Sequence, residues 1–315
     1  MSAVETRPAK APSQADAVVQ IRGLRKTYRD KEAVCGIDLD VRRGEIFTFL
    51  GPNGAGKTTT VEILEGYRSR DAGEVEVLGR DPASPTREWR SRIGVVLQTC
   101  DVWPELTVSE SLSLFARYYP EPLSVDRTLE LVGLQRDRDR RAGQLSGGQK
   151  RRLDVGLALV GNPELLFLDE PTTGFDPSAR HHAWEVIAGL RELGKTVFLT
   201  THYMDEAEAL ADRVAVIVDG LIVAEGAPHE IGGRDRERVI ISFRLPDAVE
   251  TGELPIPPGD ELHLEGELVE VRTAQPTATV AVLGRWAVDH DLELAQLEVH
   301  RPTLEDIYLR LTDGR

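Results

Sequence analysis

The chain has 315 residues, of which 41% are hydrophobic and 29% are charged, which is enough apolar material for a buried core. The 53 acidic residues outnumber the 38 basic ones, and the net charge of −15 excludes a broad electrostatic footprint for nucleic acid. Cys35 and Cys100 are too few for a disulfide framework. No segment reaches the roughly 18 to 20 apolar residues of a membrane span, and residues 1–10 lack the apolar core of a secretion signal, so we expect a cytoplasmic protein.

The first two thirds of the chain have the pattern of an α/β domain. Residues 1–17 show no periodicity and predict a disordered tail. Short β-branched runs then alternate with amphipathic stretches over residues 18–228, a rhythm typical of buried, mainly parallel strands. The predicted strands are residues 18–21, 45–50, 93–97, 165–168, 196–200 and 214–218. Helical patterns dominate residues 107–161 and predict a helical subdomain at about residues 100–161.

A change of composition after Gly226 predicts a domain boundary, followed by a small α+β domain at residues 229–315. Strand patterns at residues 239–245 and 267–272 and a helical pattern at 277–287 support it. The last helix should begin at Pro302, which suits the first helical position. Its apolar face must pack against another surface. That face consists of Leu304, Ile307, Tyr308 and Leu311.

A glycine-rich motif follows the apolar run 46–50 and precedes a helical stretch, the context that a phosphate-binding P-loop requires. Its amides can surround a β-phosphate, Lys57 can reach the β and γ oxygens, and the Thr58 hydroxyl can ligate Mg²⁺. The motif offers Lys57 no evident structural partner. The predicted nucleotide contacts here are Gly51, Pro52, Asn53, Gly54, Ala55, Gly56, Lys57, Thr58 and Thr59.

Two carboxylates, Asp169 and Glu170, follow the apolar run 165–168. In a P-loop fold, Asp169 would hold Mg²⁺ through water, and Glu170 would orient and deprotonate the water that attacks the γ-phosphate. Alone, such a pair could equally be a solvated strand end. The P-loop about 110 residues upstream favours the catalytic role.

Four features together resemble the ATP-binding-cassette (ABC) ATPases: the P-loop, the two carboxylates, His202 and the run Leu145-Ser146-Gly147-Gly148-Gln149. The five-residue run is similar to the signature motif of that family. The resemblance covers about residues 18–228 and implies a RecA-like P-loop nucleotide-binding domain. It also implies that two copies pack head to tail and sandwich two ATP molecules, each between the P-loop of one copy and the signature of the other. Ser146, Gly147, Gly148 and Gln149 would then bind the nucleotide of the partner.

The resemblance implies roles for four further residues. Tyr28 would stack on adenine, although an ordinary half-buried tyrosine is the alternative. Gln98 would approach both Mg²⁺ and the reacting water. Asp176 would cross to the other protomer, and His202 would sense the γ-phosphate. The implied catalytic set is thus Glu170, His202 and Gln98, and the implied metal set is Thr58, Gln98 and Asp169.

With a single cassette and no membrane span, the chain would need a separate permease as its transport pathway. The long coiled coil of DNA-acting members and the second cassette of translation-type members are both absent, so we expect no nucleic-acid partner. Residues 100–110 resemble the stretch that receives the permease coupling helix, with Trp103 and Leu106 as apolar contacts.

Residues 147–177, the segment from Thr200 and residues 301–308 together resemble ATPase subunits of ABC-2-type, daunorubicin-resistance-type multidrug exporters. The resemblance implies a Mg²⁺-dependent ATPase at the cytoplasmic face of the membrane that drives export of a drug-like or other amphipathic substrate. The alternatives are a soluble regulatory ABC ATPase without a permease and an importer ATPase. The substrate itself is not encoded in this chain.

Overall fold

The computed structural model describes residues 16–29, 31–96, 103–231, 238–245, 249 and 251–313. The chain divides into two compact units, Met1–Pro228 and His229–Arg315. The predicted tail lies almost entirely outside the described residues. Across the described part of the chain, no helix combines the length and apolar composition needed to cross a bilayer.

The first unit is built around a six-stranded sheet of order β5-β6-β7-β3-β8-β9. Its strands are β3 (Ile46–Leu50), β5 (Ile93–Val96), β6 (Leu165–Asp169), β7 (Thr196–Thr201), β8 (Arg213–Val218) and β9 (Leu221–Gly226). All pairs are parallel except β8 with β9. The parallel strands predicted from the apolar runs are therefore confirmed, apart from residue 97, which lies outside the described residues.

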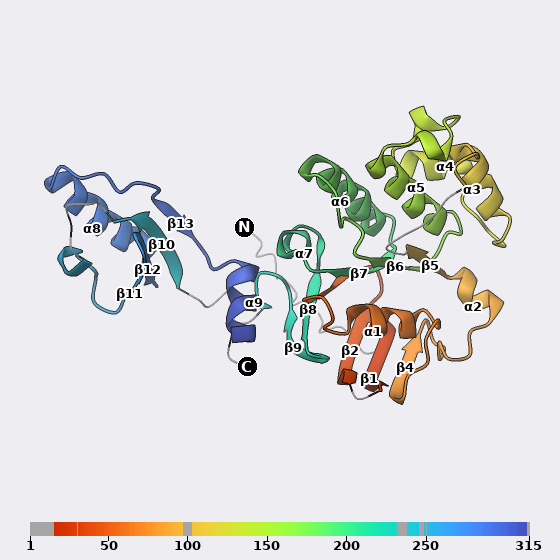
Figure 1. The fold of residues 1–315 in the computed structure, drawn as a ribbon, viewed down its shortest axis with the longest axis horizontal. Helices are drawn as coiled ribbons and strands as arrows, with labels where there is room; N and C mark the ends of the chain where they lie inside the picture. Colours follow the sequence, from red (N-terminus) through yellow and green to blue (C-terminus); the bar gives the residue numbers. More distant parts are fainter. Residues whose placement is uncertain are drawn as a thin grey trace, which may run out of the picture. The chain divides into compact units, whose positions relative to one another are not determined.

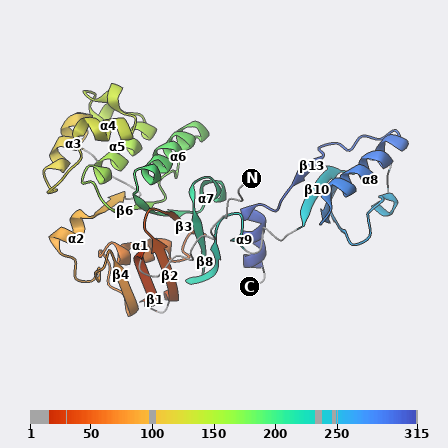
Figure 2. The ribbon, with the colours of Figure 1, turned by 180° about the vertical axis from the view of Figure 1, so that it is seen from behind.

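Side chains alternate between the two faces of this sheet, and each face has its own core. Phe47, Phe167 and Phe198 belong to one core, which also includes residues of β1, β2, β4 and α1. Leu166 and Leu199 belong to the other, which includes the helices α3 to α6. Both ribbon views show these two layers on opposite sides of the parallel strands (Figures 1 and 2). Burial on both faces explains why these strands read as continuous apolar runs.

The run at residues 18–21 does not join the parallel sheet, so this part of the prediction was wrong. It lies in a separate antiparallel sheet of order β2-β1-β4, formed by β1 (Ala17–Tyr28), β2 (Lys31–Arg42) and β4 (Ala72–Val77). Only residues 29 and 30 separate β1 from β2, and so short a connection permits antiparallel pairing alone.

The helices of the first unit are α1 (Lys57–Leu64), α2 (Arg87–Ser91), α3 (Val108–Ala116), α4 (Val125–Leu131), α5 (Gly147–Leu159), α6 (Pro177–Glu192) and α7 (Met204–Leu210). Three of them, α3, α4 and α5, lie grouped beside α6 (Figure 1). Thr107, Ser124 and Ser146 cap these three helices through their side-chain oxygens. The helices predicted within residues 107–161 are therefore confirmed.

The second unit has a four-stranded antiparallel sheet of order β11-β12-β10-β13. Its elements are β10 (Val239–Arg244), β11 (Glu261–Glu265), β12 (Leu268–Thr273), α8 (Pro276–Asp289), β13 (Glu298–His300) and α9 (Leu304–Asp313). Phe243 and Val271 of the sheet share one core with Leu283 of α8. This confirms the α+β architecture expected for the C-terminal part.

The last helix begins at Leu304 and not at Pro302. The Thr303 hydroxyl accepts a hydrogen bond from Asp306 N at 3.1 Å, and Thr303 N donates to Asp306 Oδ2 at 2.6 Å. This reciprocal pair makes Thr303 the cap and leaves Pro302 outside the helix. On the predicted apolar face, Leu304 and Ile307 are buried and Tyr308 is half-buried, whereas the side chain of Leu311 lies outside the described set.

Candidate active site

The P-loop joins β3 to α1 and is packed tightly against its neighbours. Gly54 and Gly56 have φ angles of 82° and 109°, in the left-handed region that favours glycine. A Cβ atom on Gly56 would lie 2.4 Å from the carbonyl oxygen of Ala33 in β2. Gly51 N donates to Thr201 O at 3.3 Å, which ties the loop to the end of β7. These contacts fix the position of the P-loop, and α1 begins directly after it at Lys57.

Lys57 is the first residue of α1 and is 4% exposed. Its Nζ donates to the carbonyl oxygens of Gly51 at 2.8 Å and Pro52 at 3.1 Å, and it lies 3.5 Å from Glu170 Oε1. The expectation that the motif offers Lys57 no structural partner was therefore wrong, because its ammonium bonds two backbone carbonyls of the loop and also lies beside Glu170, which follows β6. Burial lowers the pKa of the Lys57 ammonium, and the Glu170 carboxylate opposes this shift.

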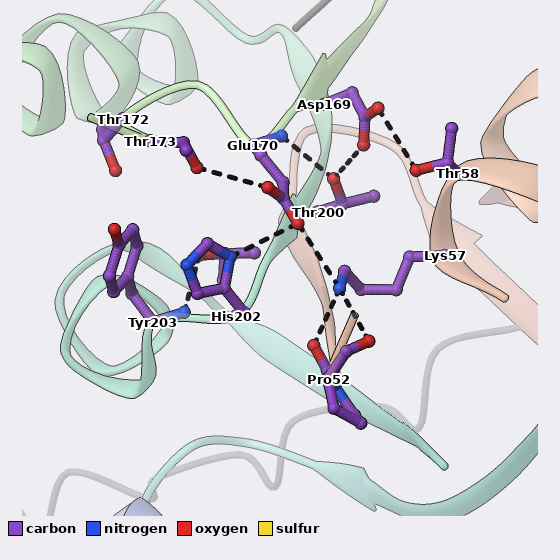
Figure 3. Close-up of polar contacts among 12 residues, drawn as sticks. Pro52, Lys57, Thr58, Asp169, Glu170, Thr172, Thr173, Thr200, His202 and Tyr203 are labelled. Atoms are coloured by element: carbon purple, nitrogen blue, oxygen red, sulfur yellow. Dashed lines mark hydrogen bonds and ion pairs between the residues drawn. The ribbon is translucent and has the colours of Figure 1, made fainter. Parts of the chain in front are cut away.

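Asp169 ends β6 and lies beside the start of α1 (Figure 3). Its Oδ2 lies 3.5 Å from Thr58 Oγ1, and its Oδ1 accepts a hydrogen bond from the Thr200 hydroxyl. A hydroxyl and a carboxylate this close offer the hard oxygen ligands that Mg²⁺ prefers. The residues present thus fit a magnesium ion next to the P-loop phosphate cradle.

Glu170 follows Asp169 in a left-handed conformation, with a φ of 45°. Non-glycine residues rarely adopt this conformation, and it persists where surrounding contacts enforce it. Glu170 N donates to Thr200 O at 3.1 Å and to Thr200 Oγ1 at 3.0 Å. The turn directs the carboxylate toward Lys57 and His202 (Figure 3).

The Glu170 carboxylate lies among three polar side chains. Its Oε1 lies 3.3 Å from His202 Nδ1, and its Oε2 accepts a hydrogen bond from the Thr173 hydroxyl at 3.2 Å. Burial by itself raises the pKa of this carboxyl, but the Lys57 ammonium and the contacts with His202 and Thr173 outweigh burial and hold the pKa below its ordinary value. Glu170 is therefore ionised at neutral pH, as a general base must be.

His202 follows the end of β7, and its ring lies against that of Tyr203 with the ring centroids 4.1 Å apart. The structure thus brings His202 together with Lys57, Thr58, Asp169 and Glu170, which come from three separate parts of the chain (Figure 3).

Sequence reasoning missed Thr200, which contacts both Asp169 and Glu170. The sequence feature that could have indicated it is a threonine near the end of the apolar strand β7. Thr200 is fully buried there, and a buried hydroxyl needs hydrogen-bond partners.

Tyr28 ends β1 and is paired with Lys31 of β2, in the hairpin whose Ala33 touches the P-loop. The residue is 37% exposed, and the guanidinium of Arg68 lies 5.2 Å from the centroid of its ring. An aromatic ring at the surface near the P-loop is compatible with stacking on a base, and this role stays a prediction.

The residues Ser146 and Gln149 open α5 with a reciprocal cap. Gln149 N donates to Ser146 Oγ at 3.3 Å, and Ser146 N donates to Gln149 Oε1 at 2.9 Å. Asp176 likewise caps α6 by accepting from Ala179 N at 2.9 Å. A hollow of about 480 Å³ is lined by this start of α5, by Asp176 and by α6, and no P-loop residue lines it. The predicted site residues therefore form two separate groups within one chain.

One predicted site residue is not placed. Gln98 lies in residues 97–102, outside the described residues, so its role stays a prediction.

Comparisons with known proteins agree on one family. The model of the family "ABC transporter" matches residues 34–173, and that of an "ABC transporter domain-containing protein-like, C-terminal domain" matches residues 239–303. A Nod factor export ATP-binding protein I from Ralstonia nicotianae is 38% identical over 301 residues, covering 94% of each chain. The chain belongs to the ABC transporter family. A protein of the same name from Burkholderia orbicola is 40% identical and covers 94% of this chain and 97% of the relative.

Solved ABC cassettes share the fold of the first unit. The cbiO1 protein of Clostridium perfringens, part of the ABC transporter complex cbiONQ, has a TM-score of 0.62 and 29% identity and covers 68% of this chain and 90% of its own. A dimeric ABC cassette bound to ADP and Pi has a TM-score of 0.59 and 27% identity, covering 66% of this chain and 98% of its own. The resemblance to ABC ATPases and the P-loop fold with an additional C-terminal domain are thereby confirmed. As an ABC ATPase, the chain binds ATP and hydrolyses it.

Proposed function

We propose that this ABC protein is the ATP-hydrolysing subunit of an exporter and energises transport through a separate permease. The observation that carries this proposal is the convergence of Lys57, Asp169, Glu170 and His202 at the P-loop. The export direction is supported by relatives named Nod factor export ATP-binding protein I, which match over 94% of the chain. We propose a drug-like or other amphipathic molecule as the substrate.

The chemistry of the proposed site follows from its charges. The P-loop amides and Lys57 bind the phosphates, and Glu170 accepts a proton from the attacking water. His202 and Thr173 hold the Glu170 carboxylate in place. When bound by Thr58, Asp169 and Gln98, Mg²⁺ would neutralise phosphate charge. We assign residues 18–228 as the nucleotide-binding domain and residues 229–315 as an accessory domain.

A second copy of the chain completes the proposed site. Ser146 and the amides of Gly147 and Gly148 would bind the γ-phosphate held by the partner's P-loop, with Gln149 supporting them. The hollow beside the signature is lined by no P-loop residue of the same chain, which supports a nucleotide supplied by the P-loop of a second copy.

Magnesium dependence gives a direct test of the proposed metal ligands. Chelation of divalent cations should abolish hydrolysis, and Asp169→Asn should lower it even in excess MgCl₂, because a neutral amide is a weaker ligand for a hard cation than a carboxylate. Hydrolysis and ATP binding should be measured over a MgCl₂ titration. Asp205→Asn on α7, an exposed carboxylate, is the control. Full activity of the wild-type chain in a chelator would contradict the metal site.

An aromatic surface offers a contact for the permease. Trp103 is 55% exposed, and its ring lies 6.5 Å from that of Phe115. Phe115 in turn lies edge-on to Tyr118, which is 64% exposed, while Leu106 is half-buried. Exposed aromatic clusters of this kind mark protein interfaces. We propose that an ABC-2-type permease docks here and holds the subunit at the cytoplasmic face of the membrane.

Replacing both Trp103 and Leu106 by Ala should separate hydrolysis from transport. Each truncated anchor can cost about 2 kcal/mol or more when it is a hot spot, so binding to permease-containing membranes should weaken and export should be lost. The soluble variant should bind ATP like the wild type, since both residues lie in the segment that leads into α3 and not in the P-loop. Nucleotide affinity and membrane co-sedimentation are the measurements.

Tyr67→Ala removes an aromatic ring that is 82% exposed outside this surface and is the matched control. Retained membrane binding and export in the double variant would exclude this surface as the contact. A wild-type chain that never sediments with its permease would favour the soluble regulatory ATPase. Uptake in place of export by the reconstituted pair would favour the importer.

A further inference from the structure

A buried arginine connects the signature helix to the peptide that carries Glu170. Arg151 lies on α5, and its side chain is 8% exposed. Its Nε donates to Pro171 O at 3.0 Å, and its Nη2 donates to Asp169 O at 3.2 Å. These two carbonyl groups stand on either side of Glu170. A single guanidinium therefore holds the backbone both before and after the proposed base.

The unfavourable backbone conformation of Glu170 needs supporting contacts in order to persist. Its left-handed φ of 45° costs free energy for a residue with a side chain, and such a conformation persists where the surroundings over-determine it. Thr200 of β7 fixes the amide of Glu170. Arg151 fixes the flanking carbonyls from the opposite element, α5. Removing either support would allow the turn to relax and would displace the carboxylate.

An arginine suits this position better than a lysine. The planar guanidinium presents several N–H groups in fixed directions, whereas an ammonium is a point charge on a flexible stem. Hydrogen bonds donated by a charged group are also stronger than those between neutral groups. Asp154, one turn further along α5, lies 3.9 Å from Arg151 Nη1 and balances its charge within the helix.

We propose that Arg151 is a positioning residue that holds Glu170 in its working geometry and ties that geometry to the signature helix. This inference rests on the proposed function, in which the signature binds the nucleotide of the partner. Closure of the signature on the partner's nucleotide would then be transmitted through Arg151 to Glu170, which serves the nucleotide of its own chain. The two ATP sites would be coupled through one side chain in each subunit.

Arg151→Lys tests the positioning role. We expect kcat for ATP hydrolysis to fall about 10-fold to 10²-fold, because displacing a catalytic group by about 1 Å has effects of this size. The dissociation constant for ATP should stay near that of the wild type, since the contacts of Arg151 named above lie outside the P-loop. Lys150→Ala removes an exposed charge from the same helix turn and should leave kcat unchanged. Equal loss of ATP binding and hydrolysis would overturn the proposal.

A double-mutant cycle with Glu170→Gln distinguishes positioning from a general structural effect. If Arg151 acts through Glu170, adding Arg151→Lys to Glu170→Gln should cause no further loss of the residual hydrolysis. Additive losses would overturn the proposal. If Arg151→Lys is unfolded at the assay temperature, Arg151→Gln with Asp154→Asn replaces it, because that pair removes both charges of this buried ion pair together.

Mixed dimers decide which nucleotide Arg151 serves. One subunit carries Lys57→Ala and a first affinity tag, and the other has an intact P-loop and a second tag, so a single site hydrolyses ATP. Arg151→Lys in the subunit with the intact P-loop should lower turnover, whereas the same change in the Lys57→Ala subunit should not. The reverse pattern would show that Arg151 shapes the signature and would overturn the proposal. Absence of hydrolysis or of dimers in the wild type would instead contradict the proposed function.

Discussion

Replacing Glu170 by Gln should lower ATP hydrolysis by about 10²-fold or more while ATP still binds. The amide keeps the size of the side chain and its capacity to accept a hydrogen bond from Thr173, but it cannot take a proton from water. Because the pKa of Glu170 lies below its ordinary value, the wild-type carboxyl is ionised at neutral pH, and the variant loses the proposed base. Single-turnover hydrolysis and ATP binding should be measured side by side.

Because bound ATP is no longer consumed, Glu170→Gln should accumulate as an ATP-bound dimer. Size-exclusion chromatography with light scattering in saturating MgATP gives this result directly. Glu185→Gln, on the exposed side of α6, makes the same chemical change away from the site and should behave like the wild type. A Glu170→Gln protein that stays monomeric under these conditions would count against the sandwich of two copies.

Lys57→Ala should abolish hydrolysis and weaken ATP binding, because the ammonium is the fixed positive charge of the P-loop. The structure adds a second consequence. Lys57 lies 3.5 Å from Glu170 and lowers the pKa of that carboxyl, so its removal should move the Glu170 pKa upward. Hydrolysis, ATP affinity and thermal unfolding should be measured together.

The unfolding measurement separates chemistry from stability in this variant. Lys57 is buried and donates to two loop carbonyls, which lose a partner when it is removed. Lys195→Ala is the control. Lys195 donates a hydrogen bond to Asn162 and directly precedes β7, at the opposite end of this strand from His202. Wild-type turnover by Lys57→Ala would contradict the P-loop assignment, whatever its melting temperature.

The sequence alone identified the P-loop, the signature and the two carboxylates at the end of the apolar run of β6. Each of these is a contiguous motif whose chemistry depends on neighbouring residues: glycines that permit left-handed turns, and polar groups placed directly after a buried strand. The parallel strands were also predictable, because burial on both faces makes them continuous apolar runs. The motifs were sufficient to indicate an ABC ATPase.

The tertiary structure decided how the motifs meet. The order of β6, β7 and β3 in the sheet brings Thr200 and His202 to Glu170, and no local pattern specifies that order. Strand β1 pairs antiparallel with β2 because of a two-residue connection, although its apolar run resembles those of the parallel strands. Lys57 and Arg151 acquire partners from distant segments for the same reason. Contacts between residues far apart in the chain depend on the packing of whole elements, and that packing determines how the proposed base, Glu170, is held.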